Sequence, residues 1–229
     1  MPRRARLTLA GIPLHIIQRG NNRSPCFFTQ KDYRYYLRHL EIQALEFGCD
    51  IHAYCLMTNH VHLLLTPRES DSASLMMKYL GQRFVQYINR SYKRSGTLWE
   101  GRFRSCLAQD AHYVLTCYRY IELNPVRANM VVHPRDYPWS SYHQNGEGKQ
   151  SSLITEHPSF VGLAESERDR RAVYRALIDA RLTDQQLRDI RSATNGNYVF
   201  GSAGFQREIG SRLNRRVMPA RAGRPRKGD

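Results

Sequence analysis

The sequence has no long apolar run, and this absence limits the classes of protein to which it can belong. No stretch of about 18 consecutive apolar residues occurs in the chain. The first residues, Met1-Pro2-Arg3-Arg4, also lack the apolar segment that a secretory signal needs. We therefore expect neither a membrane span nor export, and we predict a cytoplasmic protein.

Paired cysteines are absent as well. The five cysteines are an odd number, and no two of them form a Cys-x-x-Cys pair. A zinc ribbon or a disulfide framework would need such pairs. Buried, reduced thiols are the favoured interpretation.

Acidic residues are scarce relative to basic ones. The chain has 20 Asp and Glu against 35 Lys and Arg, a formal net charge of +15. This excess favours a polyanionic partner, and with no amphipathic anchor evident, nucleic acid is favoured over a membrane. The 14 tyrosines and 8 phenylalanines favour single strands, whose exposed bases stack on aromatic rings. We predict a nucleic-acid partner and association with the nucleoid; a basic surface that serves only solubility is the alternative.

The periodicity of the apolar residues predicts an α+β fold. Thr29 and Asp110 are expected to cap the first and third helices, and Gly48 to end the first. The predicted order is strand, helix, strand, strand, helix, strand and helix, over residues 13–19, 30–47, 50–57, 60–66, 72–93, 101–108 and 111–123. This is the ferredoxin-like βαββαβ arrangement with one added helix. We expect an antiparallel sheet with helices on one face and the other face free for a site.

A change in composition after Tyr142 predicts further divisions of the chain. Capping residues at Ser166, Thr183 and Ser202 then predict three helices. The predicted parts are a main domain, a flexible linker, a helical accessory region that contacts DNA, and a basic disordered tail, at residues 1–144, 145–152, 153–215 and 216–229. In the tail, Arg224 and Arg226 are expected to contact phosphates.

Two histidines one residue apart form the first half of a candidate site. Side chains alternate along a strand, so His60 and His62 lie on one face, as a possible half-site for a divalent metal. If Thr58-Asn59 is a two-residue loop, His60 lies opposite Met57 and His62 opposite Cys55. A hydrogen-bonded surface pair is the alternative.

The helix predicted over residues 111–123 carries the second half. Tyr120 and Asn124 are four residues apart, hence on one helical face, and Tyr113 extends that face toward the start of the helix. Tyr118 lies about 200° around the helix from Tyr120 and is not expected in the site. Asn124 before Pro125 is also typical of a residue that caps a following helix.

These motifs together resemble a known family. The sequence is similar to the REP-associated tyrosine transposases, in the single-tyrosine branch of the HUH endonucleases, over roughly residues 5–145. The residues that carry the resemblance are Leu56-Met57-Thr58-Asn59, His60-Val61-His62, Leu98-Trp99-Glu100-Gly101-Arg102-Phe103 and Tyr120-Ile121-Glu122-Leu123-Asn124-Pro125-Val126-Arg127.

The resemblance implies a role for each residue of the site. His60 and His62 would bind Mg²⁺ or Mn²⁺, Tyr120 would be the nucleophile, and Asn124 would be a third ligand or contact the scissile phosphate. The implied activity is cleavage and rejoining of single-stranded DNA at hairpins of repetitive extragenic palindromes, through a 5′-phosphotyrosine and without a nucleotide cofactor. A monomer and a homodimer are both open.

Further residues are candidates for contacts with DNA. Arginines flank the predicted sheet, and basic side chains lie on the exposed face of the helix predicted over residues 72–93; the candidates are Arg19, Arg23, Arg102, Arg104, Lys78 and Arg83. A solvated charged face is the alternative for each. Core packing is favoured over base stacking for Trp99 and Phe103, and a hydrogen bond within the sheet over a place in the site for His15.

Two other functions compete with this interpretation. A DNA- or RNA-binding regulator on the same fold would bind a hairpin without cutting it, but it has no reason to combine His60, His62 and Tyr120. A zinc hydrolase would need a carboxylate at ligand spacing, and Glu69 follows only at a distance, after a proline.

Overall fold

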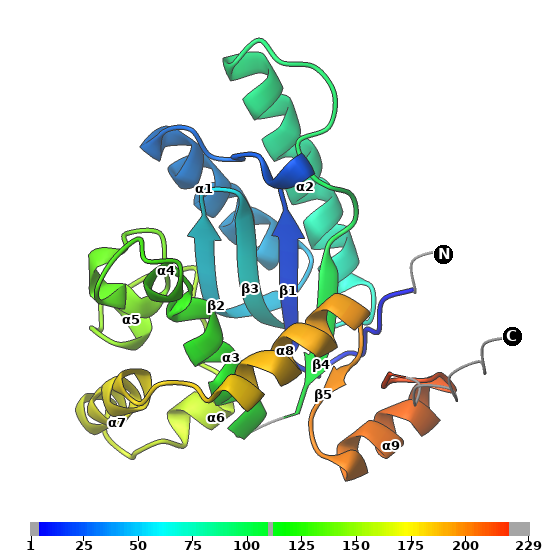
Figure 1. The fold of residues 1–229 in the computed structure, drawn as a ribbon, viewed down its shortest axis with the longest axis vertical. Helices are drawn as coiled ribbons and strands as arrows, with labels where there is room; N and C mark the ends of the chain where they lie inside the picture. The colour runs from blue at the N-terminus through cyan, green and yellow to red at the C-terminus, as the bar shows by residue number, and fades with distance from the viewer. Residues whose placement is uncertain (1–4, 110–111, 220–229) are drawn as a thin grey trace, which may run out of the picture.

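The computed structural model describes residues 5–109 and 112–219, and its centre is one five-stranded sheet. The strand order is β2-β3-β1-β4-β5 (Figure 1). The strands are β1 (Leu14–Arg19), β2 (Cys49–Met57), β3 (His60–Pro67), β4 (Arg104–Ala108) and β5 (Val199–Phe200). The pairs among β1 to β4 are antiparallel, whereas β5 pairs with β4 in parallel. The predicted ferredoxin-like arrangement is confirmed, with β5 added at one edge.

The hairpin of β2 and β3 has the register that its short loop predicts. Cys55 pairs with His62, and Met57 pairs with His60. Strand alternation then places Val61 and Leu63 on the opposite face of the sheet, where both are fully buried. One face of β3 is therefore apolar, and the histidines lie on the other.

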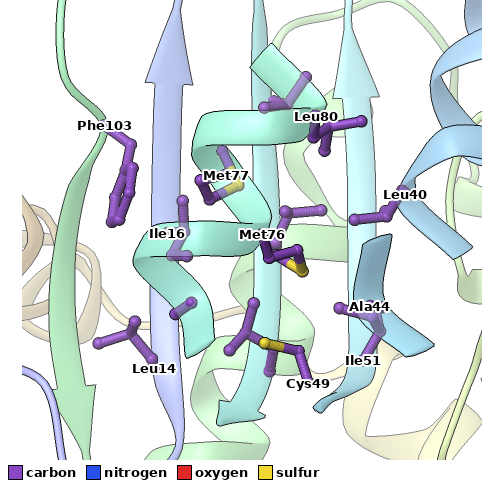
Figure 2. Packing of buried hydrophobic residues seen from close by; sticks show 14 of the residues in the cluster. Leu14, Ile16, Leu40, Ala44, Cys49, Ile51, Met76, Met77, Leu80 and Phe103 are labelled. Carbon is purple, nitrogen blue, oxygen red and sulfur yellow. The ribbon is translucent and has the colours of Figure 1, made fainter. Parts of the chain in front are cut away.

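Two long helices cover the apolar face. They are α1 (Gln30–Glu46) and α2 (Ser72–Ser91), and Thr29 begins α1 as predicted, its amide donating to the side chain of Asp32. Figure 2 shows Leu40 of α1 and Met76 of α2 beside Ile16 and Ile51 of the strands, and all four side chains are buried. Burial of this apolar surface is the main term that holds these helices on the sheet.

The other face of the sheet is covered too, which corrects the expectation of a free face. It is covered by α3 (His112–Glu122) and α8 (Asp184–Gly196), which lie on the opposite side from α1 and α2 (Figure 1). This face carries buried apolar residues such as Leu64 and Cys106, and Ile190 and Ala193 of α8 pack in the same cluster. The face is covered because exposing this apolar surface to water would be unfavourable.

The C-terminal region is helical, as predicted, and it also joins the sheet. Ser166, Thr183 and Ser202 each accept a capping hydrogen bond at the start of their helices. β5 was not predicted, because two residues are too few for a strand period to show. The remaining elements are α4 (Asn124–Arg127), α5 (Tyr142–Asn145), α6 (Pro158–Val161), α7 (Glu167–Asp179), α9 (Ala203–Leu213) and the 3₁₀ helices η1 (Asn21–Arg23) and η2 (Pro134–Asp136).

Two residues at the predicted boundaries are buried. Asn145 begins the predicted linker, yet it is only 1% exposed and its side chain donates to the carboxylate of Glu122. Val217, in the predicted tail, is buried, and its carbonyl accepts from the amide of Val199. The predicted cap Asp110 and the predicted phosphate contacts Arg224 and Arg226 lie outside the described residues.

The cysteines are buried, as the sequence predicts. All five are free thiols in the interior. Burial raises the pKa of Cys106 to about 12, so this thiol stays protonated near pH 7. In the described part of the chain, no helix combines the length and the apolar character that crossing a membrane requires.

Candidate active site

The two histidines of β3 lie on the sheet face that α3 and α8 cover. Arg19 of β1 pairs with His60, and Ile17 pairs with His62. The imidazole rings of His60 and His62 are 5.0 Å apart between centroids and nearly perpendicular. His15, on the same face of β1, stacks on His62 at 5.2 Å. A row of three imidazoles therefore crosses the centre of the sheet.

Helix α3 brings Tyr120 to this row. The Tyr120 ring lies 5.6 Å from the His62 ring and 5.7 Å from the His15 ring, edge-on to both. The residue is 8% exposed. The tyrosine and the histidines belong to one chain, so a single copy of the protein brings them together.

A chain of hydrogen bonds fixes which nitrogen of His62 carries the proton. The Thr194 hydroxyl donates to the carbonyl of Ile190 at 2.7 Å, so it accepts from His15 Nδ1 at 3.0 Å. A neutral His15 with a proton on Nδ1 must accept at Nε2, where His62 Nδ1 lies at 2.9 Å. His62 therefore keeps its proton on Nδ1, and its Nε2 presents a lone pair.

His60 is oriented in the same way by its neighbour Asn59. The Asn59 amide nitrogen donates to the carbonyl of Arg23 at 2.9 Å, so its oxygen accepts from His60 Nδ1 at 2.6 Å. The Nε2 atom of His60 is again left with a lone pair. Both histidines thus present the same atom, although different partners hold them.

The surroundings keep both imidazoles neutral. Burial lowers the pKa of His60 to about 4, and the Arg19 guanidinium adds to this effect. Burial also holds the pKa of His62 well below its usual range, with His60 and His15 as the next causes. Neutral histidine is the form that binds metal ions.

These residues fit a divalent metal. Metal-binding histidines use one ring nitrogen as ligand and donate the other N–H to a neighbouring acceptor, which is the state of His60 and His62. Residues 5–109 and 112–219 contain no cluster of three or more His, Cys, Asp or Glu that could hold a metal ion. Within this region the two imidazoles would be the protein ligands, and water or phosphate oxygens would complete the set.

The position of Asn124 bears on its two interpretations. It is the first residue of α4, whose cap is Leu123, and no side chain caps this short helix. The Asn124 amide nitrogen is buried and, within the described residues, has no hydrogen-bond partner. The capping role is therefore not observed, and the unpartnered nitrogen could donate to an acceptor such as a phosphate oxygen.

Arg127 is a residue of the site to which sequence reasoning gave no role. Its Nη2 donates to the carbonyl of Tyr120 at 2.6 Å, and its guanidinium carbon lies 4.3 Å from the centre of the Tyr120 ring. Burial lowers the pKa of Arg127 to about 10, which leaves the side chain charged near pH 7. Its place seven residues after Tyr120, within the Asn-Pro-Val-Arg motif, was the available signal.

Three of the predicted DNA-contacting arginines come together beside the site. Arg19, Arg102 and Arg104 line one small pocket, together with Asn195 of α8. The Arg104 side chain donates to the Asn195 oxygen at 3.0 Å. Arg19 pairs with His60 in the sheet, so the pocket adjoins the histidine row. Its arginines add positive charge beside the site.

The other predicted contacts are not gathered there. Arg23 is exposed in η1. Lys78 and Arg83 are exposed on α2, which packs on the opposite face of the sheet from the histidines. A DNA strand would have to pass around the edge of the sheet to reach both the histidine row and α2.

The remaining aromatic residues lie where the sequence favours. Trp99 and Phe103 are buried in the core beneath α2. Tyr118 stacks on Phe160, away from the histidine row, and Tyr113 contacts Phe200 of β5. Among the tyrosines of α3, Tyr120 is the one whose ring contacts His15 and His62.

A ferredoxin-like sheet that presents a His-x-His pair to a tyrosine on the helix after the fourth strand is the arrangement of a single-tyrosine transposase domain. Comparison with known families agrees with this class. The sequence profile of the family described as "Transposase IS200 like" matches residues 8–124, more than half of the chain. The protein belongs to this family.

Individual relatives confirm the resemblance to REP-associated tyrosine transposases. A protein of Haemophilus influenzae described by that name is 29% identical over 103 residues, which are 41% of this chain and 58% of that protein. The matched part is thus little more than half of the relative. The solved structure of a REP-associated tyrosine transposase bound to a REP hairpin has a TM-score of 0.55 and 22% identity, and the match covers 69% of this chain and 96% of that one. This second likeness shows a shared fold.

Proposed function

We propose that the protein is a single-stranded DNA endonuclease and strand transferase that acts through Tyr120 at hairpin-forming repeats. The observation that carries the proposal is the contact of the Tyr120 ring with His62, whose Nε2 presents a lone pair to a ligand. Membership of the transposase family supports the activity. The relative bound to a REP hairpin supports a hairpin as the substrate.

The proposed reaction is a transesterification at one phosphodiester. The Tyr120 hydroxyl oxygen forms a bond to phosphorus, and the bond from phosphorus to the 3′ oxygen breaks. The tyrosine proton leaves to solvent or to a neighbouring base, and the departing 3′ oxygen gains a proton. The products are a 5′-phosphotyrosine and a free 3′ hydroxyl.

The residues around Tyr120 hold the reacting groups in place. His60 and His62 would bind Mg²⁺ or Mn²⁺ through Nε2, with the Asn124 amide as a third contact. The ion, when bound, would withdraw negative charge from the scissile phosphate. Arg19, Arg102 and Arg104 would bind neighbouring phosphates and fix the path of the strand.

The same residues support rejoining. The phosphotyrosine link conserves the energy of the original bond, so a second 3′ hydroxyl can attack it and release Tyr120. No nucleotide cofactor is required for this exchange. Because one chain brings Tyr120 to its own histidines, a single copy suffices for cleavage in this proposal.

The test uses hairpin DNA with single-stranded flanks, labelled at the 5′ or the 3′ end and incubated with Mg²⁺ or Mn²⁺. Wild type should form an adduct that survives denaturation and keeps the label on the 3′ side of the cut. Tyr120→Phe should form none. Tyr113→Phe is the matched control, because it removes a hydroxyl from the same helix at a ring that packs on Phe200 instead of on the histidines.

Two outcomes would contradict the proposal. An adduct that persists in Tyr120→Phe would place the nucleophile elsewhere. Tight binding of hairpins without cleavage under any metal condition would instead favour the non-catalytic DNA- or RNA-binding regulator.

A further inference from the structure

Arg127 is held in place by a single one of its guanidinium nitrogens. It ends the short helix α4, which follows directly on α3 and starts at Asn124-Pro125. Its Nη2 donates to the Tyr120 carbonyl, and the planar group lies over the Tyr120 ring. A cation over an aromatic face is an attractive arrangement.

The other two guanidinium nitrogens of Arg127 make no hydrogen bond to the described residues. Nε and Nη1 are buried and, in the part of the chain that the structure describes, have no hydrogen-bond partner. Arginine is rarely buried without an anionic partner, because removing the charge from water is costly. After burial, the Tyr120 side chain contributes most to the pKa of Arg127 and raises it, and the next contribution is that of Arg191, whose positive charge lowers it. The site thus holds a buried cation that lacks its anion.

The missing anion must lie close to Tyr120 and the histidine row. The charge of Arg127 contributes to lowering the pKa of both His15 and His62, which places it within electrostatic reach of both rings. Guanidinium N–H groups form strong, charge-assisted hydrogen bonds to phosphate oxygens. A phosphodiester in position for attack by Tyr120 would supply these oxygens.

We propose that Arg127 binds the scissile phosphate, donating to its non-bridging oxygens from the N–H groups of Nε or Nη1. The inference rests on the proposed function and adds a substrate contact to it. As the Tyr120 oxygen adds to phosphorus and the 3′ oxygen leaves, negative charge builds on these non-bridging oxygens, and the Arg127 charge stabilises it. After cleavage the same contact holds the phosphotyrosine for rejoining.

The test separates binding from chemistry by using the Tyr120→Phe protein. The cut position is first mapped with wild type, and a hairpin is then made with a neutral methylphosphonate at that linkage. Affinities for this hairpin and for the natural one are compared by fluorescence anisotropy without a divalent metal, so that no metal contact to the same phosphate adds to the difference. With Arg127 present, loss of the phosphate charge should weaken binding by about tenfold. With Arg127→Gln added, the two hairpins should bind equally.

Matched variants control for charge and for folding. Arg191→Gln removes a neighbouring positive charge on α8 that is exposed, and it should keep the full methylphosphonate penalty. Arg127→Lys keeps the charge without the planar guanidinium and should show a reduced penalty. If the glutamine variant does not fold, the methylphosphonate penalty of Arg127→Lys is compared with that of the protein that keeps Arg127.

The outcomes distinguish this inference from the function on which it rests. Suppose that wild type forms an adduct through Tyr120, but the methylphosphonate penalty is the same with Arg127 and with Arg127→Gln. That result would overturn only the role of Arg127 as a phosphate contact. Absence of any such adduct from wild type would overturn the proposed function itself. Loss of the penalty in Arg127→Gln, with its retention in Arg191→Gln, would support the inference.

Discussion

His15 and His62 share a hydrogen bond of 2.9 Å between Nε2 of the first and Nδ1 of the second. The two residues lie on neighbouring strands, and Thr194 of α8 holds the far side of His15 at 3.0 Å. Because α8 belongs to the C-terminal region, a segment beyond the part matched by the family profile sets the proton position of a candidate metal ligand. This contact joins the C-terminal region to the chemistry of the site.

Removing the Thr194 hydroxyl should therefore weaken metal binding without unfolding the protein. Thr194→Val keeps the shape but deprives His15 Nδ1 of its acceptor, so the proton on His62 is no longer fixed on Nδ1. We expect the affinity for Mn²⁺ to fall by about tenfold, as is usual when a residue that hydrogen-bonds to a metal-binding histidine is removed. Isothermal titration of the DNA-free protein with Mn²⁺ measures this directly.

Thr116→Val is the matched control for that experiment. Thr116 is equally buried, and its hydroxyl donates to the carbonyl four residues earlier, as that of Thr194 does. It does not bond to His15, so its loss should leave the Mn²⁺ affinity unchanged. Equal affinities for wild type and Thr194→Val would show that the His15 contact does not orient the ligand.

The free energy of unfolding should fall as the pH is lowered below about 6.5, because a buried histidine takes up its proton only at a lower pH than an unfolded one. His52 lies between the Thr155 carbonyl and the Thr66 hydroxyl, and burial lowers its pKa to about 4. His157, whose ring is 4.9 Å away, lowers this pKa further, whereas Asp50 and the Thr155 carbonyl raise it.

The direction of this pH dependence follows from the different pKa values of His52 in the folded and unfolded protein. An unfolded histidine takes up a proton near pH 6.5, whereas folded His52 does so only near pH 4, so acid favours unfolding between these values. The full contribution is present above pH 6.5 and is lost as the pH falls toward 4. His52→Gln should remove up to about 3 kcal/mol of the difference in unfolding free energy between pH 7 and pH 4. Urea denaturation across this range is the measurement, and a wild-type slope in the variant would contradict the prediction.

Regular elements could be predicted from the sequence because their signals are local. The two-residue loop at Thr58-Asn59 fixes the register of the hairpin, and strand alternation then puts His60 and His62 on one face. Capping residues such as Thr183 mark helix starts within one turn. Each of these depends on residues close in the sequence.

The rest of the site depends on contacts between distant segments. His15 and Thr194 are 179 residues apart, and no periodicity connects them. Helix α8 covers the histidine face because that face carries apolar surface. The total apolar surface of a sheet face depends on several distant strands, so local sequence patterns do not reveal it. Arg127 belongs to the Asn-Pro-Val-Arg motif of the sequence. What singles it out is a pair of buried nitrogens without partners among the described residues, and burial is a property of the fold.

Glu122 is a second residue whose role appears only in the folded chain. Its carboxylate is fully buried and accepts from the Ser141 hydroxyl at 2.5 Å, the Asn145 amide at 2.7 Å and the Tyr174 hydroxyl at 2.6 Å. It joins α3 to α5 and α7, so the C-terminal region is tied to the helix that carries Tyr120. Glu122→Ala would remove the shared acceptor of three buried donors and should cost about 3 kcal/mol of unfolding free energy.

Glu122→Gln provides the comparison for this variant. The glutamine oxygen can still accept from Ser141 and Asn145, and the Tyr174 hydroxyl can turn to accept from the amide, so a loss of about 1 kcal/mol is expected. Chemical denaturation gives both values. Equal stability of the alanine variant and wild type would mean that the network does not hold the C-terminal region on α3.

The arginines beside the histidine row should contribute to DNA binding mainly through charge. Each phosphate contact releases condensed counterions, so loss of one arginine lowers the dependence of log affinity on log salt by about 0.7 for a single strand. We expect Arg19→Gln and Arg104→Gln each to produce such a change on hairpin DNA with single-stranded flanks, and the double variant about twice as much. Arg34→Gln on α1 is the control, because Arg34 is exposed and lies on a helix of the opposite face. A salt dependence in the double variant equal to that of the control would place the path of the strand away from the pocket of Arg19, Arg102 and Arg104.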